Sequence, residues 1–161
     1  MSAEFKFIHH ACFTVTANGE TLICDPFLDG NPCHVAMEDL KVDYIFISHA
    51  HSDHLGCAYE LAKQCDALII TTAEIAGQAS ENGCKAHAMH IGGTYRFPFG
   101  KVRITPAFHG SGIAGGHACG FIIDFHGVKF YFAGDTSLFG DMQLLQELDS
   151  FRYALLPIGG N

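Results

Sequence analysis

Basic residues and long apolar segments are scarce in this sequence, and their scarcity excludes several classes of protein. Lysine and arginine number 9 against 17 aspartates and glutamates, so the formal net charge of −8 argues against a nucleic-acid partner. A small anionic substrate is still compatible, because bound divalent cations would reverse the charge locally. No apolar run is long enough to cross a membrane, and the first residues lack the segments of a signal peptide. We therefore expect a cytoplasmic protein with no membrane partner.

Tryptophan and Cys-x-x-Cys pairs are also absent. The seven cysteines are an odd number and no spacing singles one out, so we expect reduced thiols, most of them small core residues. Apolar residues make up 48% of the chain, which is enough for residues 1–161 to bury the core of one domain. Alternation along the expected strands predicts core positions for six phenylalanines, Phe5, Phe7, Phe121, Phe125, Phe130 and Phe132.

Four potential metal ligands lie within residues 48–56, which read SHAHSDHLG. His49 and His51 are two positions apart in an extended segment, so their side chains should point the same way. Asp53 and His54 follow where the chain must turn, and they can face a neighbouring point. Imidazole nitrogen and carboxylate oxygen are ligands of zinc and similar divalent ions. The loop could thus give two adjacent metals two ligands each, the alternative being a solvated loop rich in histidine.

The expected strands bring further polar residues to the same edge of a sheet. Residues 42–47 read as a buried strand and residues 58–64 as the start of a helix, a typical surrounding for an active site in an α/β sheet. Other strands are expected over 4–8, 12–16, 21–24, 67–70, 85–91, 102–108, 119–125, 128–133 and 153–156, and helices from Thr71 or Thr72 to Glu81 and over 141–148. Four of these strands end at or beside a potential ligand, namely Asp25, His49, His109 and Asp135.

This set of residues predicts a dinuclear metal centre. We assign one divalent ion to His49, His51 and His109. Zinc is the first expectation, and manganese and iron suit the same donors. Catalytic zinc sites keep one position open for water and lower the pKa of that water to about 7.

The second divalent ion is assigned to Asp53 and His54, with Asp135 able to bridge the two ions. A hydroxide shared between the ions would be the nucleophile, and Asp53 could also orient it as a catalytic residue. The ions would polarise the scissile carbonyl or phosphoryl oxygen and stabilise the charge that develops there.

The potential ligands form a series of motifs along the chain. The series is Asp25, His49-x-His51-x-Asp53-His54, His109 and Gly134-Asp135-Thr136. Over essentially the whole chain it resembles the signature of the metallo-β-lactamase fold superfamily. The segment His10-Ala11-Cys12-Phe13 and the pair Asp25-Pro26 resemble small bacterial metal-dependent hydrolases close to the L-ascorbate 6-phosphate lactonases. The resemblance implies an α/β fold, a four-layer αβ/βα sandwich, with a dinuclear zinc, manganese or iron site that hydrolyses a lactone, ester, amide or phosphoester.

Members of that superfamily usually run past 200 residues and contain a late strand whose final histidine completes the second metal site. No histidine follows Asp135 in this sequence. We therefore expect a C-terminally truncated chain, about the N-terminal two-thirds of a family domain, with a second metal site that is short of one ligand. An incomplete sheet would also expose an edge that favours a homo-oligomer.

Three further residues are candidates for contacting the substrate or orienting a ligand. They are His10, at the end of an expected strand, Asp25, and His117, for which a surface position is an equal alternative. His117 follows a loop over residues 110–116 that fits the pattern G-x-G-x-x-G. A strand rather than a helix is expected next, so we interpret this loop as the mouth of the site and not as a nucleotide site.

The leading hypothesis is a metal-dependent hydrolase acting on a small molecule. A di-iron redox protein on the same scaffold is one alternative, and it would need a partner with a flavin or iron–sulfur centre. A nuclease of the superfamily is a second alternative, which the acidic charge disfavours. A metal-binding module without catalysis is the third, because the late histidine is absent.

Overall fold

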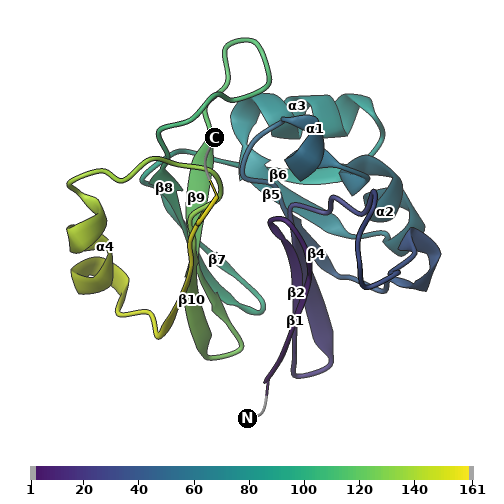
Figure 1. Cartoon of the computed structure of the whole chain (residues 1–161), viewed down its shortest axis with the longest axis horizontal. Coiled ribbons are helices and arrows are strands. Elements are labelled where there is room, and N and C mark those ends of the chain that lie inside the picture. Colours follow the sequence, from purple (N-terminus) through teal and green to yellow (C-terminus); the bar gives the residue numbers. More distant parts are fainter. Residues whose placement is uncertain (1–2, 160–161) are drawn as a thin grey trace.

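A computed structural model describes residues 3–159 as two β-sheets packed face to face, with helices on their outer faces (Figure 1). The first sheet has six strands in sequence order, β1 (Ala3–His9), β2 (Cys12–Ala17), β3 (Glu20–Cys24), β4 (Tyr44–Phe46), β5 (Leu68–Thr72) and β6 (Lys85–Met89). The second sheet has five strands in the spatial order β11 (Tyr153–Leu155), β10 (Val128–Phe132), β9 (Cys119–Phe125), β8 (Gly100–Pro106) and β7 (Thr94–Phe97). The helices are α1 (Ser52–Leu55), α2 (Ala58–Cys65), α3 (Ala73–Glu81) and α4 (Met142–Asp149), with a 3-10 turn at Met37–Asp39.

The strand directions in the first sheet follow from the lengths of its connections. Strands β1, β2 and β3 are antiparallel neighbours, and β2 turns into β3 through Asn18 and Gly19, both at positive φ as tight hairpin turns require. Strands β3 to β6 are mutually parallel. The carboxyl ends of β3 and β4 therefore lie at the same edge, which places Asp25 beside the loop that contains His49.

The apolar core fills the space between the two sheets. It contains large residues from the first sheet, such as Phe13 and Phe46, and from the second, such as Phe121 and Phe125, all four at most 1% exposed. A second cluster packs α2 and α3 against the outer face of the first sheet, and a third places Leu145 of α4 on the second sheet. The αβ/βα sandwich expected from the sequence is confirmed. No helix within residues 3–159 combines the length and apolar character needed to cross a membrane.

Most expected elements are present, and the differences are local. Strand β7 was not expected, because it is only four residues long and lies between two turn signals. The segment with Asp53 and His54, where the chain was expected to turn, is a single helical turn, α1. Thr72 precedes α3, yet its side chain does not cap the helix. The hydroxyl of Thr71 instead donates a hydrogen bond to the carbonyl oxygen of Ile47 at 2.8 Å.

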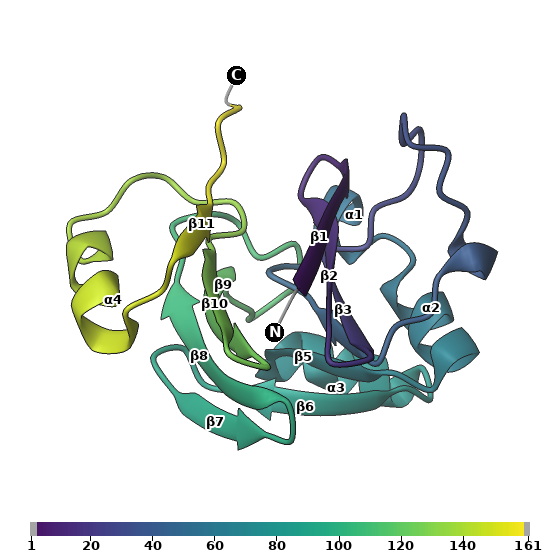
Figure 2. The same cartoon turned by 90° about the horizontal axis from the view of Figure 1, so that it is seen from below.

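The expectation that all six phenylalanines are core residues is wrong for Phe5 and Phe7. These side chains are 53% and 55% exposed, whereas the other four are buried. Strand β1 is an edge strand of the first sheet, and in Figure 2 it lies on the same side of the sandwich as β11, an edge strand of the second sheet. Alternation in the sequence indicates which side chains share a face, but it does not show whether a second layer covers that face.

Candidate metal centre

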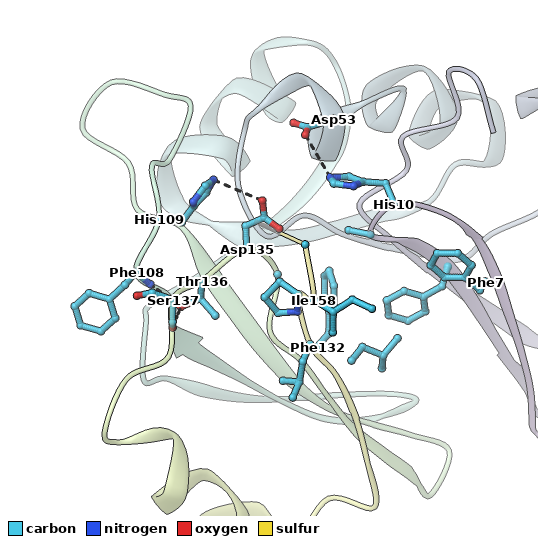
Figure 3. Close-up of a pocket in the computed structure, with 17 residues that line it drawn as sticks. Phe7, His10, Asp53, Phe108, His109, Phe132, Asp135, Thr136, Ser137 and Ile158 are labelled. Atoms are coloured by element: carbon cyan, nitrogen blue, oxygen red, sulfur yellow. Dashed lines mark hydrogen bonds and ion pairs between the residues drawn. The ribbon is translucent and has the colours of Figure 1, made fainter. Parts of the chain in front are cut away.

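The loops that follow the strand ends meet above one edge of the sandwich and surround a pocket. This pocket has a volume of about 830 Å³, and His10, Asp53, His109 and Asp135 line it (Figure 3). His10 comes from the turn between β1 and β2, Asp53 from α1, His109 from the loop after β8, and Asp135 from the loop after β10. Four segments that are distant in sequence thus bring polar side chains to one cavity.

Three histidines converge on one point beside this cavity. The Nδ1 atom of His51 lies 3.0 Å from Nε2 of His49 and 3.3 Å from Nε2 of His109. Two nitrogens that share a tetrahedral zinc ion at about 2.0–2.1 Å are about 3.3 Å apart, so this spacing suits one metal ion. The expected convergence of His49, His51 and His109 is therefore what the structure shows, and together they could hold a metal ion.

His49 is held in the tautomer that a metal requires. Its Nδ1 atom lies 2.9 Å from the hydroxyl of Ser48, and that hydroxyl donates to Oδ2 of Asp25 at 2.6 Å. Nδ1 must therefore donate to the hydroxyl, which leaves the lone pair of Nε2 free. Burial, and after it the neighbouring histidines with His54 first among them, lower the pKa of His49 to about 2. His49 is consequently neutral at pH 7.

Asp25 is fully buried and connects the two parts of the site. Its carboxylate accepts hydrogen bonds from the backbone N–H and the hydroxyl of Ser48, at 2.8 and 2.6 Å, and from Nδ1 of His54 at 2.6 Å. Three donors satisfy the carboxylate, so we interpret Asp25 as a residue that orients ligands and not as a ligand itself. It fixes His54 directly and His49 through Ser48.

One carboxylate lies near the other ring nitrogen of His54, and a second carboxylate lies beyond His10. Nε2 of His54 lies 3.4 Å from Oδ2 of Asp135 and 3.2 Å from Nε2 of His10, which in turn lies 3.3 Å from Oδ2 of Asp53. Burial disfavours the charged imidazole of His54, yet its hydrogen bond to Asp25 and the nearby carboxylates raise its pKa above the ordinary value. Within residues 3–159 no lysine or arginine pairs with these carboxylates, so the surroundings favour a bound cation.

Asp135 lies between the two groups of donors. Its Oδ2 atom is 3.4 Å from Nε2 of His54 and 3.7 Å from Nε2 of His109. The preceding Gly134 has φ +60°, and a Cβ atom there would lie 2.7 Å from the side chain of Ser48. A larger residue at position 134 would therefore displace the hydroxyl that orients His49. The position of Asp135 is suited to the expected bridging role.

A glycine contact holds the loop after β8 against the histidine-rich loop. Gly112 has φ +70°, and a Cβ atom there would lie 2.5 Å from the carbonyl carbon of Ala50 and the amide nitrogen of His51. The amide of Ala50 also donates to the carbonyl oxygen of Ser111 at 2.7 Å. These close contacts set the distance between His51 and His109.

The structure separates His117 from the cluster, and it adds one residue that was not expected. His117 is exposed and forms no hydrogen bond or ion pair with the cluster in the part of the chain described. Ser48 was not singled out from the sequence. Its only signal was its place at the end of a buried strand, directly before His49.

Comparisons with known proteins identify the family of this chain. The family profile described as "Beta-lactamase superfamily domain" matches residues 20–161. A "UPF0173 metal-dependent hydrolase" of Natranaerobius thermophilus is 55% identical over 159 residues, which cover 98% of this chain and 72% of the relative. A protein of the same name from Symbiobacterium thermophilum is 44% identical over 162 residues, with the same coverage.

Among solved structures, Igni18, described as a novel metallo hydrolase from the hyperthermophilic archaeon Ignicoccus hospitalis, superposes with a TM-score of 0.89. It is 33% identical, and the match covers 99% of this chain and 72% of that one. The superfamily expected from the sequence motifs is confirmed. The chain therefore belongs to the beta-lactamase superfamily, within the UPF0173 family of metal-dependent hydrolases.

Proposed function

We propose that this chain hydrolyses a small molecule at a dinuclear metal centre built by its two sheets as one domain. One ion is held by His49, His51 and His109. The observation that carries the proposal is the convergence of three ring nitrogens. Nδ1 of His51 lies 3.0 Å from Nε2 of His49 and 3.3 Å from Nε2 of His109, and one proton cannot form good hydrogen bonds among all three. A bound cation would accept a lone pair from each of the three nitrogens at once.

The second ion is held by Asp53 and His54, with Asp135 placed between both groups of donors. When bound, two divalent ions supply Lewis-acid activation of a water molecule and of the scissile bond. Asp53 is about half exposed at the pocket, so its carboxylate is free to orient the water and accept a proton. The donor set fits zinc first, with manganese and iron as alternatives.

The pocket walls favour a substrate that carries an apolar part. Phe7, Phe132 and Ile158 line the cavity opposite the polar cluster (Figure 3), and Phe13 lines the cavity as well. No lysine or arginine is among the described residues that line it. Any anionic charge on the substrate would thus be met by the metal ions alone. We infer that an uncharged ester, lactone or amide is preferred over a phosphoester.

The test compares the wild-type chain with two histidine variants after metal loading. His51→Ala removes a donor and should lower the metal content and abolish hydrolysis of a panel of esters, lactones, amides and phosphodiesters. His87→Ala is the matched control, because the His87 ring packs against Tyr95 of the edge strand β7, with the two ring centroids 4.3 Å apart. It should change neither quantity. Unchanged metal content in His51→Ala would contradict the assignment, and two bound metals without any hydrolysis would favour a binding module.

A further inference from the structure

We propose that His10 is a protein ligand of the second metal ion, so that this site does not depend on a histidine later in the chain. The inference rests on the proposed function and extends it. From the sequence, His10 was expected to contact substrate or to orient a ligand. The geometry points to direct coordination through Nε2, together with Asp53 and His54.

The distances of the three donor atoms suit a single ion. Nε2 of His10 is 3.2 Å from Nε2 of His54 and 3.3 Å from Oδ2 of Asp53. All three atoms lie within 4.8 Å of one another. Donors that share a zinc ion at about 2.0–2.2 Å are separated by about 3.3–3.6 Å, so little movement is needed. Figure 3 shows the ring of His10 directed toward Asp53.

Hydrogen bonding alone does not account for this arrangement. Nδ1 of His54 is engaged by Asp25, so Nε2 is the nitrogen of His54 that faces His10. The carboxylate of Asp53 presents only lone pairs when ionised. Nε2 of His10 carries at most one proton, so it cannot donate to Asp53 and accept from His54 at the same time. A metal ion accepts from all three atoms at once.

The backbone holds His10 in an uncommon conformation that produces this direction. His10 has φ +52° in the two-residue turn between β1 and β2, and the register of the pair shifts just before it. Residues other than glycine seldom occupy this region, and such positions concentrate at functional sites. Phe27 packs edge-on against the ring, with centroids 6.2 Å apart, and limits its rotation.

The second site then has three protein donors in His10, Asp53 and His54. Asp135, 3.4 Å from Nε2 of His54, is available as a fourth. This number is sufficient for a catalytic zinc site, which needs three protein ligands and one open position. From the sequence we expected a second site that is short of one ligand. We now propose that His10 supplies that ligand, which the following experiment tests.

The experiment measures zinc stoichiometry and affinity by chelator competition and elemental analysis. The variant His10→Gln keeps an N–H donor but replaces imidazole with a weak amide ligand. We expect two zinc ions per wild-type chain, and in His10→Gln one tight ion with the other weakened about 100-fold or lost. His9→Gln is the matched control, since His9 stacks on Phe27 and lies outside the donor groups, and it should bind two.

The outcomes separate this inference from the proposed function. Two ions of unchanged affinity in His10→Gln would overturn the role of His10 and leave the proposed function intact. Loss of both ions in a folded His10→Gln would also overturn the assignment to the second site. A wild-type chain that binds no zinc would overturn the proposed function itself. If His10→Gln does not fold, the ¹⁵N shift of Nε2 of His10 in the wild type decides at constant pH. A large change on addition of the second zinc equivalent supports coordination, and no change overturns it.

Discussion

Replacing Ser48 with alanine removes one hydroxyl that serves both halves of the site. Ser48 is fully buried, and its Oγ atom donates to Asp25 and accepts from Nδ1 of His49. The hydrogen bond to the carboxylate contributes about 1.5–3 kcal/mol and the one from His49 about 1 kcal/mol. The metal-free chain should therefore lose about 3 kcal/mol of its free energy of unfolding. Because His49 also loses its orientation, the affinity for the first metal should fall about 10–100-fold.

The assay is urea unfolding in the presence of a chelator, followed by zinc titration of the folded protein. Ser52→Ala is the matched control, since Ser52 is exposed at the start of α1 in the same loop. Ser52→Ala should leave the free energy of unfolding and the free energy of zinc binding within about 0.5 kcal/mol of the wild type, as exposed substitutions usually do. If Ser48→Ala also stays within that range and binds zinc normally, the hydrogen-bonded connection from Asp25 to His49 has no energetic role.

Two further predictions concern the supports of the site and of the second sheet. Gly112→Ala should lower both the thermal stability and the metal content, because the added Cβ would overlap the histidine-rich loop. Gly115→Ala is the control, since Gly115 has a similar positive φ but open space around it, and this variant should keep its metals. Equal metal loss in both variants would refute the contact argument. Asp149→Asn should lower the free energy of unfolding at pH 7 by about 3 kcal/mol, because buried Asp149 pairs with Lys101 and Arg103. Burial opposes ionisation, but the two cations lower the pKa of Asp149, so its stabilisation is present above pH ~4 and is lost as the pH falls through the lowered value. The difference between wild type and variant in urea unfolding should shrink below pH ~4, and a difference that does not change with pH would contradict the ion-pair explanation.

Local sequence patterns predicted most of the residues that meet at the site, although not Ser48. Strand periodicity placed Asp25 and His49 at neighbouring strand ends, and the structure puts them within one hydrogen-bonded group. This succeeded because β3 and β4 are parallel neighbours, which brings their carboxyl ends to one edge of the sheet. The same argument placed His109 and Asp135, although His109 lies beyond the end of β8 in a loop held by Gly112.

What the sequence did not reveal depends on contacts between distant segments. Ser48 acquires its importance only when its hydroxyl meets Asp25, which is 23 positions away. The direction of the His10 ring is set by a positive φ in a tight turn, and no local pattern predicts it. Phe5 and Phe7 follow the expected alternation, but their exposure depends on what lies beside the edge strand β1.

The most direct test of the dinuclear centre is anomalous diffraction at the zinc absorption edge from crystals of the zinc-loaded chain. The account predicts two peaks for each chain. One should lie among Nε2 of His49, Nδ1 of His51 and Nε2 of His109, and the other beside Nε2 of His54. A single peak bound by Asp25, or no peak within the pocket, would contradict the account.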